Sequence, residues 1–169
     1  MIAYDLIGQT PLVLLENFSD ENVKIYAKLE QFNPGGSIKD RLGKYLIEKA
    51  IDEGRLKEGD TIDEATAGNT GIGLAIASNR HKVKCIIFAP EGFAEEKISI
   101  MKALGADVRR TPKAEGMTGA QQEALAYATR YGYLYMNQFE TKDNPGAYTQ
   151  TLAKQLTDEL SHIDYFVAG

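Results

Sequence analysis

The sequence contains a single cysteine, Cys85, so the chain cannot form an internal disulfide bond. Cys85 lies within the apolar run 83–88, a position typical of a reduced, buried core residue and not of a nucleophile. The only histidines are His81 and His162, and they lack the spacing of metal ligands. We therefore expect neither a disulfide nor a metal site.

Positive charge is also scarce. The net charge is -5 and the lysines and arginines form no run, which argues against a nucleic-acid partner. No apolar run approaches the length of a membrane span, and the first residues lack a basic segment followed by an apolar one. With 43% hydrophobic and 25% charged residues, the sequence predicts a globular, cytoplasmic protein with one sizeable core and no membrane partner.

Strand and helix patterns alternate along most of the chain. Apolar residues predict strands at 12–15, 23–30, 61–65, 83–88, 106–110, 133–136 and 165–167, and helices at 38–54, 70–80, 94–104, 118–131 and 147–160. Strands separated by helices imply crossover connections and a parallel sheet covered on both faces. The predicted fold class is therefore α/β with a doubly wound parallel sheet.

One turn places a lysine at the start of the helix 38–54. The stretch reads NPGGSIKDR from Asn33 to Arg41. Ser37 followed three residues later by Asp40 predicts an N-cap with a capping-box partner and a helix that begins at Ile38. The positive end of the helix dipole disfavours an ammonium and favours a neutral, nucleophilic amine. Lys39 is thus a candidate for a Schiff base; the alternative is a solvated surface charge.

Two loops lie beyond the expected carboxyl ends of strands, where ligands bind in an open parallel sheet. The loop 66–71 offers hydroxyls, an amide and closely spaced backbone N–H groups to an anion such as a carboxylate. Its alternative is a plain Asn/Gly-rich turn. Gln138 follows the strand 133–136 and could equally be a loop amide with its hydrogen bonds satisfied.

The lysine motif 33–41 resembles the pyridoxal-phosphate lysine motif of the cysteine synthase and cystathionine β-synthase family, which has the fold-type II architecture of tryptophan synthase β. Segments 8–12, 28–30 and 66–71 also resemble that family. The resemblance runs from Gly8 to Gly169 and covers about the first half of a family member. It implies a smaller α/β domain at 37–139, and an incomplete larger cofactor-binding domain formed by 1–36 with 140–169.

The resemblance also implies roles for individual residues. Lys39 would be the catalytic residue and would hold pyridoxal phosphate as a Schiff base, with Asn69 on the cofactor's phenolic oxygen. Ala67 departs from the serine common in cysteine synthases, a variant found among members that make cystathionine. The family's phosphate-binding Gly/Thr-rich loop would follow Gly169. The expected substrate-carboxylate site comprises Thr66, Ala67, Gly68, Asn69, Thr70 and Gln138.

By the same resemblance, the expected reaction is β-replacement on O-acetylserine with sulfide to give cysteine. The first alternative is cystathionine formation from homocysteine with O-acetylserine or serine, and the second is a truncated, non-catalytic fragment. Deamination is disfavoured, because the asparagine-bearing loop and Gln138 resemble the sulfur-transferring branch. We expect a homodimer, or a partner chain that supplies the missing C-terminal half.

Four tyrosines and one aspartate also carry predictions about packing. We expect Tyr127, Tyr131, Tyr133 and Tyr135 to be packing residues. Asp63 stands where the family has an aliphatic residue, and a carboxylate in a strand covered on both faces is costly unless it is paired or at an edge.

Overall fold

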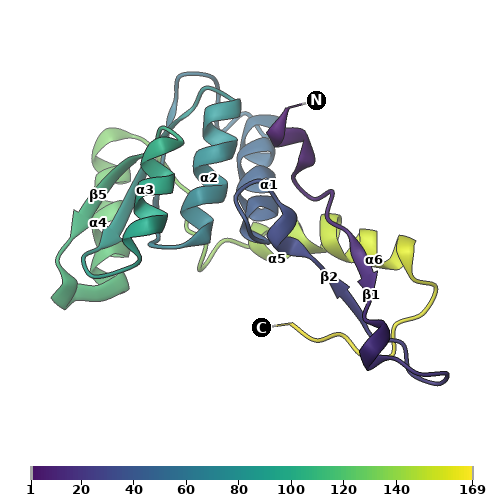
Figure 1. The fold of residues 1–169 in the computed structure, drawn as a ribbon. Helices are drawn as coiled ribbons and strands as arrows, with labels where there is room; N and C mark the ends of the chain where they lie inside the picture. Colours follow the sequence, from purple (N-terminus) through teal and green to yellow (C-terminus); the bar gives the residue numbers. More distant parts are fainter. Residues whose placement is uncertain (1, 169) are drawn as a thin grey trace.

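A computed structural model describes residues 2–168. Its centre is a four-stranded parallel sheet with the strand order β5-β4-β3-β6 (Figure 1). The register places Asp63 between Ile86 and Tyr135 of the neighbouring strands. The strands are β3 (Thr61–Ala65), β4 (Lys84–Pro90), β5 (Asp107–Thr111) and β6 (Leu134–Tyr135).

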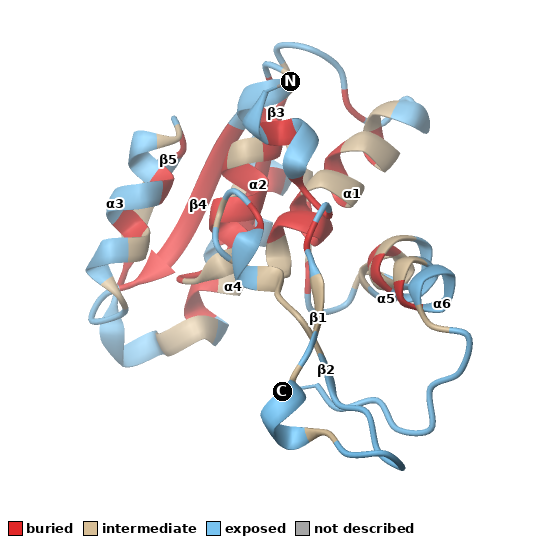
Figure 2. Cartoon of the chain, turned by 45° about the vertical axis from the view of Figure 1, so that its right-hand side comes forward, coloured by how far each residue is buried: buried red, intermediate tan, exposed pale blue. Residues whose placement is uncertain are grey.

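Helices cover both faces of this sheet, which confirms the doubly wound α/β prediction. Ile62 and Ile87 face a core cluster shared with α1, α2 and α3, whereas Ile86 and Phe88 face α4. Helix α1 packs on α2 as an outer layer, and buried residues concentrate in β3, β4 and α2 (Figure 2). These helices are α1 (Lys39–Asp52), α2 (Asn69–Arg80), α3 (Glu95–Ala103) and α4 (Gly116–Tyr131).

A second, smaller group of elements lies beyond α1, away from the sheet (Figure 1). Strands β1 (Leu12–Leu14) and β2 (Tyr26–Lys28) form a two-stranded antiparallel sheet, so the strand predicted at 23–30 is much shorter than expected. The predicted helix 147–160 begins earlier and is interrupted: α5 (Asp143–Tyr148) leads into a π-helical turn (Thr149–Ala153) and α6 (Lys154–Glu159). Short 3₁₀ turns occupy Ala3–Leu6, Glu16–Phe18, Glu30–Phe32 and Lys113–Glu115.

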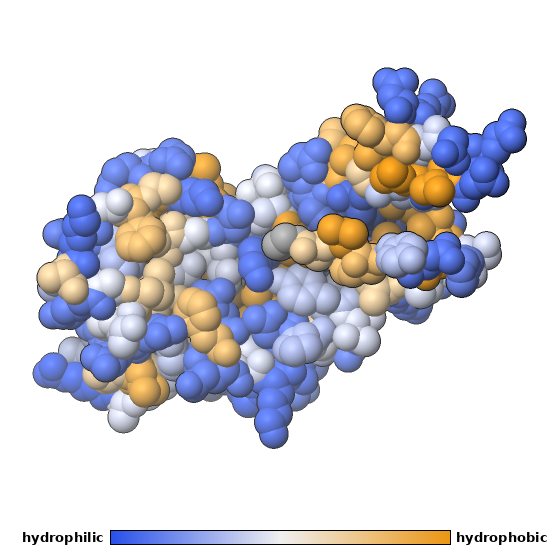
Figure 3. All heavy atoms as spheres, turned by 90° about the horizontal axis from the view of Figure 1, so that it is seen from below, coloured by the Kyte–Doolittle hydropathy of each residue, from blue (hydrophilic) through white to orange (hydrophobic). Residues whose placement is uncertain are grey.

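The strand predicted at 165–167 is wrong. Tyr165 and Val167 are each 91% exposed, and no strand of residues 2–168 pairs with them. An extended segment becomes a strand only when a neighbour satisfies its backbone groups, and none of the strands within residues 2–168 pairs with this one. Gly169 lies outside the described residues. In Figure 3, apolar side chains gather on the lobe that carries β1, β2 and the C-terminal segment.

Other predictions about packing are confirmed. Cys85 is buried and free, and burial raises the pKa of its thiol to about 12. Tyr127, Tyr131 and Tyr133 form one aromatic cluster, with Tyr127 and Tyr131 ring centroids 4.4 Å apart, and Tyr135 packs against the same core.

Across residues 2–168 no helix is long and apolar enough to span a bilayer, and no cluster of three potential metal ligands occurs.

Candidate functional site

The lysine turn ends at Lys39, which is the first residue of α1, one later than predicted. Ser37 Oγ accepts the backbone N–H of Lys39 at 3.1 Å, but the N-cap residue is Ile38 and its side chain makes no cap hydrogen bond, so the N-cap predicted at Ser37 is wrong. The predicted capping-box partner is wrong as well. The Asp40 carboxylate accepts the N–H of Gly35 instead, because the turn folds back over it. Asp40 is buried, and burial raises its pKa to about 6.

Glycine is required in this turn by close contact. A Cβ atom at Gly35 would lie 2.4 Å from Asp40 Oδ1 and 2.8 Å from Ile72 Cγ2. Gly36 has a φ of 81°, in the left-handed region that favours glycine. The turn therefore needs Gly35 for its close contact with α1 and α2, and Gly36 for its left-handed backbone conformation.

Helices α1 and α2 touch backbone to backbone. A Cβ atom at Gly43 would lie 2.3 Å from the Gly73 carbonyl carbon, and one at Gly73 would lie 2.4 Å from the Lys39 carbonyl oxygen. Gly73 is one helical turn beyond Asn69, the first residue of α2. This contact fixes the start of α1, and with it Lys39, beside the first turns of α2.

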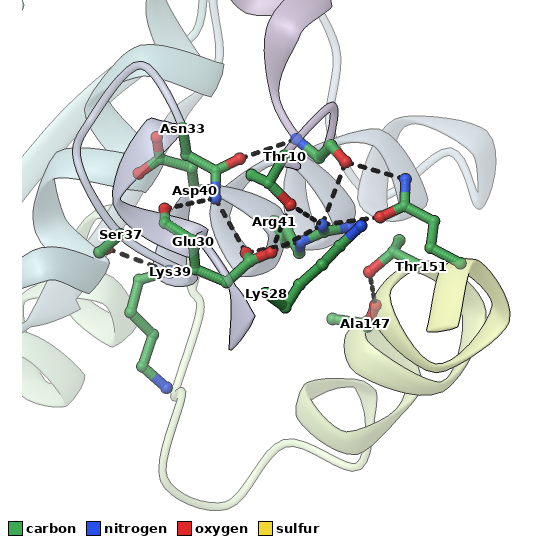
Figure 4. A network of polar contacts seen from close by, with 12 residues as sticks. Thr10, Lys28, Glu30, Asn33, Ser37, Lys39, Asp40, Arg41, Ala147 and Thr151 are labelled. Carbon is green, nitrogen blue, oxygen red and sulfur yellow. Dashed lines mark hydrogen bonds and ion pairs between the residues drawn. The ribbon is translucent and has the colours of Figure 1, made fainter. Parts of the chain in front are cut away.

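The Lys39 side chain is half-buried and does not extend into bulk solvent. Its Nζ donates a hydrogen bond to Tyr148 Oη at 2.9 Å, and it lies 5.4 Å from the centroid of that ring. Figure 4 shows the Lys39 side chain leaving α1 in a different direction from Arg41. The amine is thus held on the side of α1 away from the Arg41 network.

Arg41, two residues later, is a structural residue. Its guanidinium is buried and donates to both carboxylate oxygens of Glu30 at 2.8 Å, to Thr10 Oγ1 and Gly8 O at 3.0 Å, and to Gln155 Oε1 at 2.8 Å (Figure 4). Burial pushes the pKa of Glu30 up, but hydrogen bonds from Arg41 and Thr10 outweigh it and hold the pKa below its usual range. The network ties the N-terminal segment and α6 to the lysine helix.

Asn33, at the other end of the motif, belongs to the same network. Its Oδ1 accepts the N–H of Gly8 at 2.8 Å, and its Nδ2 donates to Glu30 Oε2 at 2.9 Å. No local sequence pattern predicts this network, because the partners of Arg41 lie 11 to 114 positions away from it. Both ends of the motif therefore belong to this network, and the Lys39 side chain points away from it.

The predicted carboxylate loop and Gln138 come together. Thr70 Oγ1 donates to Gln138 Oε1 at 2.6 Å, and Gln138 Nε2 donates to the Ala65 carbonyl at 3.2 Å, with both side chains buried. Thr66 Oγ1 accepts the N–H of Gly68 at 3.2 Å. These contacts join the loops at the carboxyl ends of β3 and β6, as predicted for a site in an open parallel sheet.

The loop also keeps open space and free polar groups. Asn69 is half-buried at the start of α2, and Ala67 is 7% exposed. An added Cβ atom at Gly68 would meet no atom within 4 Å. Backbone N–H groups at this helix start can bind an anion such as a carboxylate.

Sequence reasoning missed Glu64, which supports this site from below. Glu64 is fully buried, and its carboxylate accepts the N–H of Ala65 at 2.8 Å and of Gln138 at 2.9 Å. Burial raises its pKa to about 7, against the effect of these hydrogen bonds. The Glu64 carboxylate thereby accepts the N–H of Gln138 in place of a backbone carbonyl of β3, at the point where β6 stops pairing with β3. A charge in the wholly buried strand β3 was the available signal.

Two cavities lie apart from this arrangement. One of about 470 Å³ opens near Thr61, Lys84 and Asp107, at the amino ends of the strands. The other, of about 350 Å³, is lined by residues that include Tyr135 and Asn137. Lys39 lines neither cavity. The candidate site is therefore identified by the contacts of Lys39, the loop 66–71 and Gln138, and not by a cavity.

The residues present fit part of a pyridoxal-phosphate site. Lys39 offers a half-buried amine for an aldehyde, Asn69 an amide for the cofactor's phenolic oxygen, and the loop before α2 backbone N–H groups for a carboxylate. None of these groups is assigned to the cofactor phosphate. The fit therefore concerns the reactive end of the cofactor and the substrate.

Known proteins resemble this chain in sequence over nearly its whole length. Residues 3–169 match the family model described as pyridoxal-phosphate dependent enzyme. The chain is 49% identical over 168 residues to an O-acetylserine dependent cystathionine beta-synthase of Bacillus subtilis. The matched region covers 98% of this chain and 55% of that protein. It is 47% identical over 171 residues to a cysteine synthase of Helicobacter pylori, with 98% and 56% covered.

Solved structures show the same likeness. An O-acetylserine dependent cystathionine beta-synthase from Helicobacter pylori superposes with a TM-score of 0.87 at 46% identity, over 95% of this chain and 55% of that one. An O-ureido-L-serine synthase gives 0.87 at 34% identity, over 93% and 50%. The chain thus spans about half the length of the relatives it matches. It belongs to the family of pyridoxal-phosphate dependent enzymes, whose cofactor is pyridoxal phosphate.

Proposed function

We propose that this chain supplies the catalytic lysine and the substrate-carboxylate loop of a β-replacement enzyme that acts on O-acetylserine. The observation that carries the proposal is the hydrogen bond of 2.6 Å from Thr70 to Gln138, which joins two loops beside the helix start against which Lys39 is packed. Relatives at 47–49% identity are named as a cysteine synthase and as an O-acetylserine dependent enzyme.

Each residue of the site has a separate role in the proposed reaction. Lys39 Nζ would hold the cofactor, and the same amine, once free, would remove the proton from the substrate α-carbon. Pyridoxal phosphate, when bound, supplies an electron sink for that carbon. Thr66, Thr70 and Gln138, with the backbone N–H groups of the loop, orient the substrate by its carboxylate.

The close packing of α1 on α2 keeps the amine and the carboxylate loop at a fixed separation. Acetate would leave the β-carbon with the electron pair of its C–O bond, and a sulfur nucleophile would form a C–S bond there. Lys39 would return the proton to the α-carbon. The protein's contribution is therefore positioning, electrostatics and the exclusion of water.

We propose sulfide as the first nucleophile, with cysteine as product, in line with the cysteine synthases of Helicobacter pylori and Staphylococcus aureus among the relatives. Homocysteine is the second candidate. It is favoured by Ala67 and by the names of the Bacillus subtilis relative and the Helicobacter pylori structure.

The larger assembly is part of the same proposal. Residues 37–139 would form the smaller domain, and 1–36 with 140–169 would be part of a larger domain completed by a further segment, by a partner chain or within a homodimer. Phe18 and Phe32, which are 73% and 63% exposed, and Tyr165 supply apolar surface for such completion. A non-catalytic fragment is the remaining alternative.

Product analysis separates these possibilities. The chain is loaded with pyridoxal phosphate and supplied with O-acetylserine and either sulfide or homocysteine, and amino-acid products are quantified by mass spectrometry. Cysteine as the main product supports the first nucleophile, and cystathionine the second. Acetate release with neither product, or turnover unchanged in Lys39→Ala, would overturn β-replacement at this lysine; a loaded chain without turnover would favour the non-catalytic alternative.

A further inference from the structure

The amine of Lys39 meets a tyrosine hydroxyl that arrives from 109 positions further along the chain. The distance from Lys39 Nζ to Tyr148 Oη is 2.9 Å, and the same nitrogen lies 5.4 Å from the ring centroid. Tyr148 therefore contacts the amine with its hydroxyl while the ring lies close by. No role for Tyr148 follows from the lysine motif or from the carboxylate loop.

The backbone of α5 fixes the position of Tyr148. Its neighbour Ala147 is fully buried, and the Tyr148 ring packs against the core cluster shared by α1 and α2. A Cβ atom at Gly146 would lie 3.1 Å from Tyr45 Oη, so α5 lies close against α1. The tyrosine is thus presented to Lys39 by a packed helix and not by a mobile loop.

The wide turn after Tyr148 gives this helix a second contact with α1. The π-helical turn Thr149–Ala153 begins at the next residue, and Gln155 beyond it binds Arg41 at 2.8 Å. Inserting one residue into a helix rotates the following part by about 100°. Tyr148 can therefore reach Lys39 while Gln155 reaches Arg41, although these two side chains leave α1 in different directions (Figure 4).

We propose that Tyr148 is a positioning residue for Lys39, an inference that rests on the proposed function. A phenol oxygen accepts a hydrogen bond from an ammonium, and its O–H donates one to a neutral amine. Tyr148 holds Lys39 Nζ in either state: before the amine bonds to the cofactor, and after it has taken the substrate α-proton. Because a lysine side chain has many rotamers, this bond favours the reactive one.

The rate at which pyridoxal phosphate bonds to Lys39 tests this role. The adduct is trapped with borohydride at timed intervals and quantified at Lys39 by peptide mass spectrometry. We expect Tyr148→Phe, which keeps the ring, to slow the reaction about three- to tenfold, the effect of losing one side-chain hydrogen bond. Tyr45→Phe is the matched control on the same helix contact, and its rate should stay within about twofold of wild type.

A spectroscopic readout on the cofactor-free chain separates positioning from general destabilisation. With lysine labelled at Cε, the Lys39 NMR signal, assigned by its absence in Lys39→Ala, should lie apart from the mobile lysines. In Tyr148→Phe it should move to their average position while the backbone amide spectrum is retained, and in Tyr45→Phe it should stay.

The outcomes are distinguishable. Equal trapping rates and an unmoved Lys39 signal in Tyr148→Phe would overturn the role of Tyr148 and leave the proposed function standing. A lack of any adduct at Lys39 in wild type would overturn both. Loss of the amide spectrum in Tyr148→Phe but not in Tyr45→Phe would assign Tyr148 to stability and so contradict positioning.

Discussion

Replacing Asp63 by valine should stabilise the protein, and more so at pH 8 than at pH 4.5. Asp63 lies in the middle of β3, its side chain is fully buried, and within residues 2–168 neither carboxylate oxygen has a hydrogen-bond partner. Burial raises the pKa of Asp63 to about 7, while Arg109 opposes that rise. An ionised, unpaired carboxylate therefore opposes folding at this position.

Proton binding sets the sign and size of the effect. Between the unfolded pKa of about 4 and the folded pKa of about 7, the folded chain binds more protons, so the free energy of unfolding falls as pH rises through this range and stays low above it. This difference in pKa corresponds to a change of about 4 kcal/mol in the free energy of unfolding. Because part of the range between the two pKa values lies below pH 4.5, we expect the gain from Asp63→Val at pH 8 to exceed that at pH 4.5 by about 3 kcal/mol.

Urea denaturation followed by circular dichroism at both pH values measures this difference. Asp63→Asn is the matched variant: it removes the charge and keeps the shape, so it should lose the same pH dependence with a smaller gain. Some pH dependence should survive in both variants, because Glu64 and Asp40 also have raised pKa values. Equal effects at the two pH values, or destabilisation by Asp63→Val at pH 8, would refute the reasoning.

Substitutions at three further residues test the geometry of the site. Gly73→Ala drives a methyl group onto the Lys39 carbonyl, so it should cost about 1–3 kcal/mol in urea denaturation, and an unchanged stability would contradict the close helix contact. Arg41→Lys loses the forked contact with Glu30 and should lower the thermal midpoint by several degrees, whereas Arg41→Met should lower it further. Gln138→Ala should raise the KM for O-acetylserine about tenfold with little change in kcat; an equal fall in kcat at unchanged KM would assign it to the chemical step.

The order of strands and helices could be predicted because apolar spacing reports local structure and burial. The positions of β3, α2, β4 and α3 follow that spacing to within a few residues. Residues 165–167 show its limit. Their apolar character matches a strand, but a strand also needs a neighbour, and the spacing of side chains carries no information about one.

The candidate site divides in the same way. The loop 66–71 and Gln138 lie where strands end, so topology alone could bring them together. Glu64 and Tyr148 act through contacts 74 and 109 positions apart, which no local pattern encodes. Asp40 illustrates the competition between contacts: the sequence rule assigned its carboxylate to the helix cap, but the folded turn presents the N–H of Gly35 instead.

The most direct test of the central claim is the location of covalently bound pyridoxal phosphate. The chain is incubated with the cofactor, reduced with borohydride, digested and mapped by mass spectrometry. We predict that the label lies on Lys39 in large excess over every other lysine and that Lys39→Arg loses it. A label spread over surface lysines, with none on Lys39, would contradict the assignment of this amine as the catalytic group.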